Sequence, residues 1–106
     1  MKKPNITDGE WWVNTLGQHH NNPDIQQHEI CWSPDGECVV DHVYSLADAQ
    51  AISAVPEMID ALIEAHGFIQ TKIYLFKEQY PDQVPLNAII KLNKIEQALK
   101  KAGVEL

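Results

Sequence analysis

The sequence contains no arginine, and its eight basic residues are all lysines, against fifteen acidic residues. The formal net charge is therefore −7. Proteins that bind nucleic acid directly need clustered Lys and Arg for their phosphate contacts, so the composition argues against that class. An acidic surface is instead typical of a soluble protein, or of one that meets a basic partner protein.

Long apolar stretches are also missing. No run approaches the roughly 20 apolar residues that a membrane-spanning helix requires, so we expect no membrane partner. The first ten residues, "MKKPNITDGE", lack the apolar segment of a secretory signal. We therefore expect a cytoplasmic protein, in which the two cysteines stay reduced.

Recognisable catalytic motifs are absent as well. The sequence holds no Gly-rich phosphate loop, no HExxH pair and no Ser-His-Asp arrangement. We expect no catalytic residues, no cofactor and no enzymatic activity.

What is present predicts one domain over residues 1–106, with a β-rich part at 1–44 and a helical part at 45–106. Strands are predicted at "EWWVN", "HEICWS" and "ECVVDHVY". Residues 15–27 are polar and are predicted to be a long loop, or a strand end followed by a loop. Ser45 is suited to cap a helix over 46 to about 54, and Pro56 suits the first turn of a helix from 56 to about 79. A third helix begins near Pro85 and ends before Gly103.

The two longer helices each carry an apolar stripe at helical spacing. These stripes are Ile59, Leu62, His66, Ile69, Ile73, Phe76 and Tyr80 on one helix, and Ala88, Leu92, Ile95, Leu99 and Ala102 on the other. We predict an α+β fold in which an N-terminal antiparallel sheet of about three strands packs on a C-terminal antiparallel helical hairpin. Apolar residues off the stripes, including Met58, Phe68, Leu75 and Ile90, predict a homodimer or a higher homo-oligomer.

The stretch "HEICWSPDGECVVDH" permits two interpretations. As ligands, two histidines and two cysteines approach a zinc-binding pattern, but the six residues between Cys31 and Cys38 exceed the usual spacing. As backbone, Ser33-Pro34-Asp35-Gly36 favours a type I turn with a bulge, which pairs Trp32 with Cys38. That register places the two cysteines on opposite faces of a hairpin, so we predict neither a metal site nor a disulfide.

The same register places His28 opposite His42, and these two residues are the alternative candidates for a metal or pH-sensitive pair. Trp11 and Trp12 are adjacent and must face opposite sides of a strand, so one is predicted in the core and the other at the surface. An exposed tryptophan near His19 and His20 is the best candidate for a ligand-binding or partner-binding site. His66 lies on an apolar stripe and is predicted to be buried and hydrogen-bonded.

One segment supports a family resemblance. "ADAQAISAVPEMIDALIEA" at 47–65 resembles the "ANARLIAAAPELLEAL" motif of small uncharacterised phage and prophage accessory proteins, whose N-terminus resembles "HTPGPW". Here "TDGEWWV" at 7–13 stands at that start, and "SPDGECVVDHV" at 33–43 matches the turn and strand that follow. The resemblance covers about residues 7–65 and implies a phage-borne accessory protein with no shared catalytic residues.

Three functions remain open from the sequence. The leading one is a non-enzymatic phage accessory protein that binds and modulates a protein of the bacterial host; by analogy with other small acidic phage proteins it is a counter-defence inhibitor, for example of the anti-CRISPR kind. The second is an oligomer that sequesters a nucleotide signal. The third is a minor hydrolase or metal-binding protein that uses histidines of the β-rich part.

Overall fold

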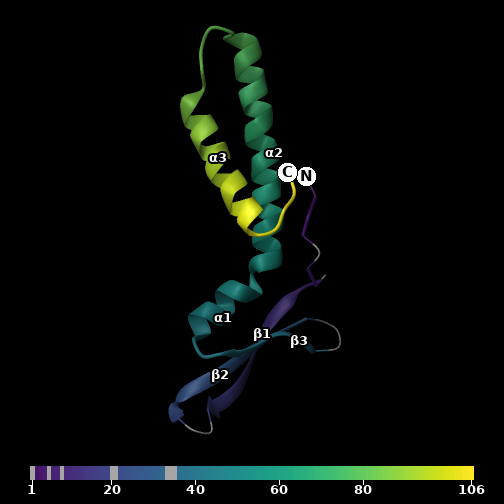
Figure 1. The fold of residues 1–106 in the computed structure, drawn as a ribbon, viewed down its shortest axis with the longest axis vertical. Coiled ribbons are helices and arrows are strands. Elements are labelled where there is room, and N and C mark those ends of the chain that lie inside the picture. Colours follow the sequence, from purple (N-terminus) through teal and green to yellow (C-terminus); the bar gives the residue numbers. More distant parts are fainter. Residues whose placement is uncertain (1, 5, 8, 20–21, 33–35) are drawn as a thin grey trace. The chain divides into compact units, whose positions relative to one another are not determined.

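A computed structural model describes residues 2–4, 6–7, 9–19, 22–32 and 36–106, and the side chains of these residues except 18, 19 and 22–24. Along this described chain, strands precede helices (Figure 1). The elements are β1 (Trp11–His19), β2 (Asn22–Trp32), β3 (Glu37–Val43), α1 (Leu46–Ser53), α2 (Val55–Gln79) and α3 (Leu86–Lys101). The predicted α+β class is confirmed, with a three-stranded antiparallel sheet followed by helices.

The chain divides into two compact units. The sheet unit is Ile6–Met58, and the helical unit is Met1–Asn5 together with Ile59–Leu106. The sequence predicts a single domain that changes from β-rich to helical after residue 44. In the structure α1 belongs with the strands because it packs on all three of them, so the division falls within α2.

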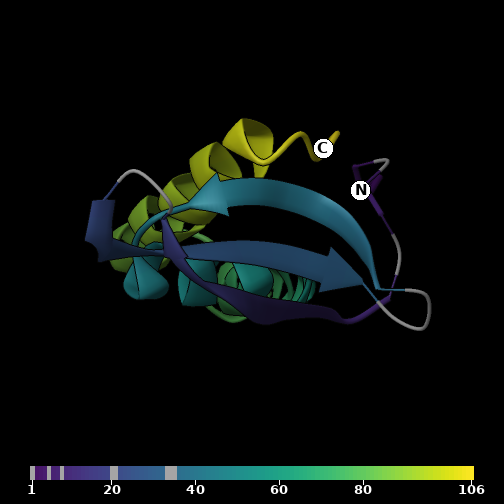
Figure 2. The same ribbon diagram turned by 90° about the horizontal axis from the view of Figure 1, so that it is seen from below.

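The sheet has the order β1-β2-β3, with β2 in the centre (Figure 2). Of the two predictions for residues 15–27, a strand end is confirmed at 15–19, where β1 continues, but a loop is wrong at 22–27, where β2 begins. Backbone pairing continues through polar residues, with irregularities between Thr15 and Gly17 and between Gln18 and His19. Gly17 adopts a φ of 97°, a conformation that glycine tolerates far better than other residues.

The core of the sheet unit lies between one face of the sheet and α1. Trp11 from β1, Ile30 from β2 and Ala49 from α1 are its buried centre. Half-buried apolar side chains surround them: Val13, Trp32, Val39, Val40, Val43, Ile52 and Val55. Burying a side chain of this size contributes roughly 1.5–3 kcal/mol, so this cluster is the main source of stability for the sheet unit.

The register of β2 and β3 differs from the prediction at two points. Trp32 pairs with Glu37 and Cys31 with Cys38, one residue away from the predicted alignment. The turn type falls on residues 33–35, outside the described residues, but Gly36 has the expected positive φ of 68°. Four residues lie between the paired residues Trp32 and Glu37, whereas the predicted turn pairs Ser33 with Glu37 and leaves three between them. Each added residue shifts a hairpin register by one. The prediction that the two cysteines face opposite sides is therefore wrong.

Irregularities in the ladder change the register again along the hairpin. A register shift restores the predicted pairing of Ile30 with Val40, and a second one pairs His28 with Val43 instead of His42. His42 itself has a φ of 55°, which is uncommon for a residue with a side chain. The predicted His28–His42 pair is thus wrong, because bulges insert residues that turn His42 away from the position opposite His28.

The helix boundaries follow the predicted signals. The Ser45 hydroxyl accepts a hydrogen bond from the Asp48 backbone N–H at 3.2 Å, which caps α1. Pro56 lies in the first turn of α2, where its missing N–H costs nothing. After α3, Gly103 adopts a φ of 87° and the Val104 N–H donates to the Leu99 carbonyl, as in a glycine-terminated helix.

In the helical unit, α2 and α3 form the predicted antiparallel hairpin (Figure 1). The predicted stripes supply its inward side, on which Ile59, His66 and Leu99 are buried. The ends of the chain also meet here, since Lys2 and Glu105 exchange two backbone hydrogen bonds of 2.7 and 3.0 Å. These contacts close the base of the hairpin.

Candidate functional site

The two adjacent tryptophans face opposite sides of β1, as predicted. Trp11 is 9% exposed in the core, and its indole N–H donates to the Thr7 carbonyl at 3.0 Å. Trp12 is 40% exposed on the other face of the sheet, beside Cys31 of β2. Of the two, only Trp12 has the surface position that a binding residue needs.

The histidines proposed as its neighbours are only partly described. His19 ends β1 and pairs with Asn22 of β2, while its side chain and the whole of His20 lie outside the described residues. The grouping of Trp12 with these histidines therefore stays a prediction. Six residues of β1 lie between Trp12 and His19, which places them toward opposite ends of the strand.

The alternative metal residues occupy different environments. His28 is 1% exposed and its Nδ1 lies 3.0 Å from the Thr15 hydroxyl, so it is part of the core. The His42 side chain is 67% exposed, and its Nε2 lies 3.8 Å from a carboxylate oxygen of Asp41. Within the described part of the chain, no group of three or more His, Cys, Asp or Glu side chains could hold a metal ion.

The face of the sheet that carries Trp12 holds a small polar cluster. Asn14 donates a hydrogen bond of 2.9 Å to the Glu29 carboxylate, and the Cys31 thiol donates to the same oxygen at 3.5 Å. Cys38 of β3 is the cross-strand partner of Cys31 of β2, and both cysteines are free thiols. The carboxylate therefore accepts from an amide and a thiol, and lies close enough to both cysteines to affect them.

This environment makes both thiols poor nucleophiles. Burial, followed by the hydrogen bond and the negative charge of Glu29, raises the pKa of Cys31 from 9.0 to about 11. Burial and the same carboxylate also raise the pKa of Cys38. Reactive cysteines need a lowered pKa in an electropositive environment, so this cluster has the opposite electrostatics to a catalytic thiol.

Charge is distributed very unevenly between the two units. The sheet unit contains nine acidic residues and neither lysine nor arginine, so its formal charge is −9. The helical unit holds the other six acidic residues and all eight lysines, which gives +2. The overall charge of −7 thus conceals a strongly acidic sheet unit. The positions of the lysines along the sequence already carry this signal, because none lies between Lys3 and Lys72.

An open groove crosses the sheet unit between β3, α1 and Ile25 of β2. Its volume is about 850 Å³. Apolar side chains on it are Ile25, Val40, Val43, Ala51 and Ile52, and polar ones are Asp41, His42, Tyr44, Ser45 and Asp48. The sheet unit has no lysine or arginine to neutralise the acidic members, and the basic side chain among the groove residues is His42, whose Nε2 lies 3.8 Å from Asp41. Such a groove suits a ligand that is cationic at its head and apolar along its stem.

A second, smaller cavity of about 340 Å³ lies in the helical unit. His66 and Glu96 line it and connect α2 to α3, with His66 Nε2 2.9 Å from Glu96 Oε1. His66 is 5% exposed, so the prediction of a buried, hydrogen-bonded histidine is confirmed. This hydrogen bond between α2 and α3 gives His66 a structural role.

Comparison with known proteins gives one match. The model of a family described as Salmonella phage P22 protein Y8K6 matches residues 1–105. No curated protein and no solved structure matches the chain. Across the residues that the structure describes, none of the helices has the length and hydrophobicity to cross a membrane.

Proposed function

We propose that the chain, which belongs to the Salmonella phage P22 protein Y8K6 family, is a non-enzymatic phage accessory protein that binds a basic surface of a host protein through its sheet unit. The observation that carries the proposal is the formal charge of −9 on residues Ile6–Met58, where lysine and arginine are absent. Electrostatic complementarity of this strength accelerates association with a basic partner and disfavours acidic ones.

The groove supplies a place for an anchoring contact. Asp41 and Asp48 line it beside apolar residues such as Val40 and Ile52. A lysine or arginine side chain of the partner would lay its methylene stem on these apolar residues and direct its charged head toward the carboxylates. We therefore assign the groove as the anchoring part of the acidic surface.

The same features argue against the other functions considered from the sequence. A nucleotide carries phosphates, and the sheet unit has no lysine or arginine to neutralise them. Thiol chemistry is disfavoured by the raised pKa values of Cys31 and Cys38. Binding a basic protein needs neither phosphate contacts nor a nucleophile. As a narrower proposal, the host protein is a component of a defence system, which would make the chain a counter-defence inhibitor.

A matched pair of variants tests the assignment. Asp41→Asn with Asp48→Asn removes two charges from the groove, and Glu78→Gln with Asp82→Asn removes two charges from the helical unit. Host proteins captured by the wild-type chain at low salt should be basic, should be lost as salt rises, and should bind the groove variant at least tenfold more weakly. The helical variant should bind within about twofold of the wild type.

Two results would contradict the proposal. One is capture of host proteins that are not basic or whose retention does not depend on salt. The other is equal weakening by both double variants, which would assign the effect to overall charge rather than to the groove.

A further inference from the structure

The helical unit buries very little of its own apolar surface. Between Gly67 and Ala98 all residues are described and none is buried, although this stretch includes most of the hairpin. Seven large apolar or aromatic side chains in it are exposed: Phe68, Tyr74, Leu75, Tyr80, Val84, Leu86 and Ile90. Helices in proteins owe most of their stability to the packing of an apolar face, so a hairpin of this kind lacks part of its core.

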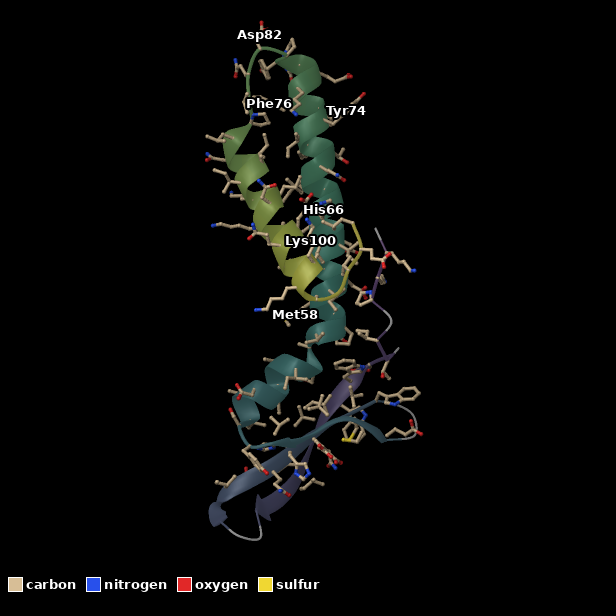
Figure 3. All side chains as sticks on the ribbon, viewed as in Figure 1. Met58, His66, Tyr74, Phe76, Asp82 and Lys100 are labelled. Atoms are coloured by element: carbon tan, nitrogen blue, oxygen red, sulfur yellow. The ribbon has the colours of Figure 1, made fainter. Side chains whose placement is uncertain are left out.

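The outer side of α2 carries part of this uncovered surface. His66 contacts Glu96 of α3, which fixes the inner side of α2. At about 100° per residue, Phe68 and Leu75 fall on the opposite side, and they are 65% and 52% exposed. Figure 3 shows that Tyr74 projects away from α3 while Phe76 lies between the helices, so apolar side chains leave α2 on more than one side. A helix that is apolar on several sides is normally covered on each of them.

Side-chain size along the outer side changes in a self-complementary way. The large residues Phe68 and Leu75 occupy its second half, and the small, exposed residue Ala61 occupies its first half. Leu75 and Ala61 are each seven residues from Phe68, at about 10 Å along the axis on either side. An antiparallel copy of the same helix, aligned at Phe68, would therefore place each Leu75 over Ala61 of the other copy.

Charge changes along α2 in the same self-complementary way. Glu64 precedes Phe68 by four residues and Lys72 follows it by four, and both are exposed on the outer side. The alignment that places Leu75 over Ala61 would also place Lys72 of each copy beside Glu64 of the other. In the single chain, Lys72 Nζ lies 5.3 Å from the centre of the Phe68 ring, which is already on this side of the helix.

We propose that α2 pairs in antiparallel fashion with α2 of a second copy of this chain, about a two-fold axis at Phe68. A two-fold interface must be its own complement, and the outer side of α2 has that property in both size and charge. The sheet unit cannot serve this purpose, because two surfaces of −9 repel, whereas the helical unit carries only +2. The dimer is independent of the host partner, which is assigned to the other unit.

Sedimentation of the full chain over a concentration series tests the dimer. The wild type should be dimeric at micromolar concentration, and Phe68→Glu with Leu75→Glu should raise the dissociation constant at least 100-fold. Two variants are controls: Tyr74→Glu changes an equally exposed residue about 100° around α2 from Leu75, and Leu86→Glu with Ile90→Glu changes the exposed apolar pair on α3. Both controls should remain dimeric. A monomeric wild type at 100 µM, or monomers from either control, would overturn the proposal.

A charge exchange tests the antiparallel alignment. Glu64→Lys alone and Lys72→Glu alone should each weaken the dimer about three- to tenfold, because each creates two like-charged contacts across the axis. The double variant restores opposite charges and should return the dissociation constant to within about twofold of the wild type. Residues eight apart on one helix do not face each other closely, so restoration reports contact between copies. Additive weakening in the double variant would exclude this alignment.

Discussion

The sheet unit and the helical unit are stabilised in different ways. In the sheet unit, Ile30 and Ala49 are fully buried between two layers, and Trp11 completes a continuous core. In the helical unit, Leu99 is a fully buried apolar side chain of the hairpin, but the stretch between Gly67 and Ala98 contains half-buried residues and no buried ones. The backbone hydrogen bonds of a helix lie within one segment, whereas those of a sheet require several strands to meet. The proposed pairing of α2 with a second copy would cover part of the apolar surface that the helical unit leaves exposed.

The two units also differ in formal charge. The sheet unit has a core of its own and an acidic surface, and the helical unit has an incomplete core and a nearly balanced surface. A strong single-sign charge prevents self-association and selects oppositely charged partners, while apolar surface with balanced charge favours self-association. The two proposed interactions, with a host protein and with a second copy, therefore use different units.

The largest expected effect tests whether the two cores are separate. Ile30→Ala in the sheet unit and Leu99→Ala in the helical unit should each cost about 2–5 kcal/mol, because both side chains are fully buried. All three tryptophans lie in the sheet unit, so tryptophan fluorescence reports on that unit alone. In urea unfolding, Ile30→Ala should lower the midpoint of the fluorescence transition. Leu99→Ala should lower only the midpoint of the helical circular-dichroism transition. Equal shifts of the fluorescence midpoint would show that the two units unfold as one.

A smaller effect should follow from the polar contact between α2 and α3. Glu96→Ala leaves the buried Nε2 of His66 without its partner at 2.9 Å and should cost about 1–3 kcal/mol in the helical unit. The neighbouring exposed residue provides the control, since Gln97→Ala should change stability by less than about 0.5 kcal/mol. Urea unfolding followed by circular dichroism measures both, and indistinguishable midpoints would show that the hairpin does not depend on this bond.

The last prediction concerns the effect of pH on the thiols of the sheet unit, which changes nothing near neutral pH. The pKa of Cys31 is raised in the folded chain from 9.0 to about 11, so the folded state holds this proton more tightly than the unfolded state. The resulting stability is complete below pH 9 and is lost as the pH rises toward 11. The fluorescence midpoint of the sheet unit should fall over this range, and the fall should be reduced in Cys31→Ala. An unchanged pH dependence in that variant would assign the fall to another group.

Helix boundaries were predictable because their signals are local. Ser45 caps α1, Pro56 begins α2 within its first turn, and Gly103 ends α3 as expected. The two apolar stripes, one with His66 and the other with Leu99, also predicted which side of each long helix is buried. Each of these inferences depends on residues within a few positions of one another, where backbone sterics and hydrogen bonding determine the result.

The strand register was not predictable in the same way. A connection between the two strands that is one residue longer than predicted is enough to bring Cys31 opposite Cys38. Bulges then move His42 away from the position opposite His28. Bulges and loop lengths differ in free energy by little, and the sequence near the turn does not distinguish them. The polar start of β2 was missed for a related reason, since backbone pairing there does not follow an apolar alternation. The gap between Lys3 and Lys72 is visible in the sequence, but the boundaries of the unit that it makes acidic required the structure.

The absence of lysine and arginine from the sheet unit has a consequence for proteolysis. Trypsin cuts only after those two residues, so between Lys3 and Lys72 it finds no bond to cleave. Digestion can shorten the hairpin from Lys72 onward, yet it leaves every strand, α1 and the first turns of α2 in one acidic fragment whether that fragment is folded or not. Proteases that cleave after aromatic or acidic residues would instead distinguish the folded sheet unit from the unfolded one.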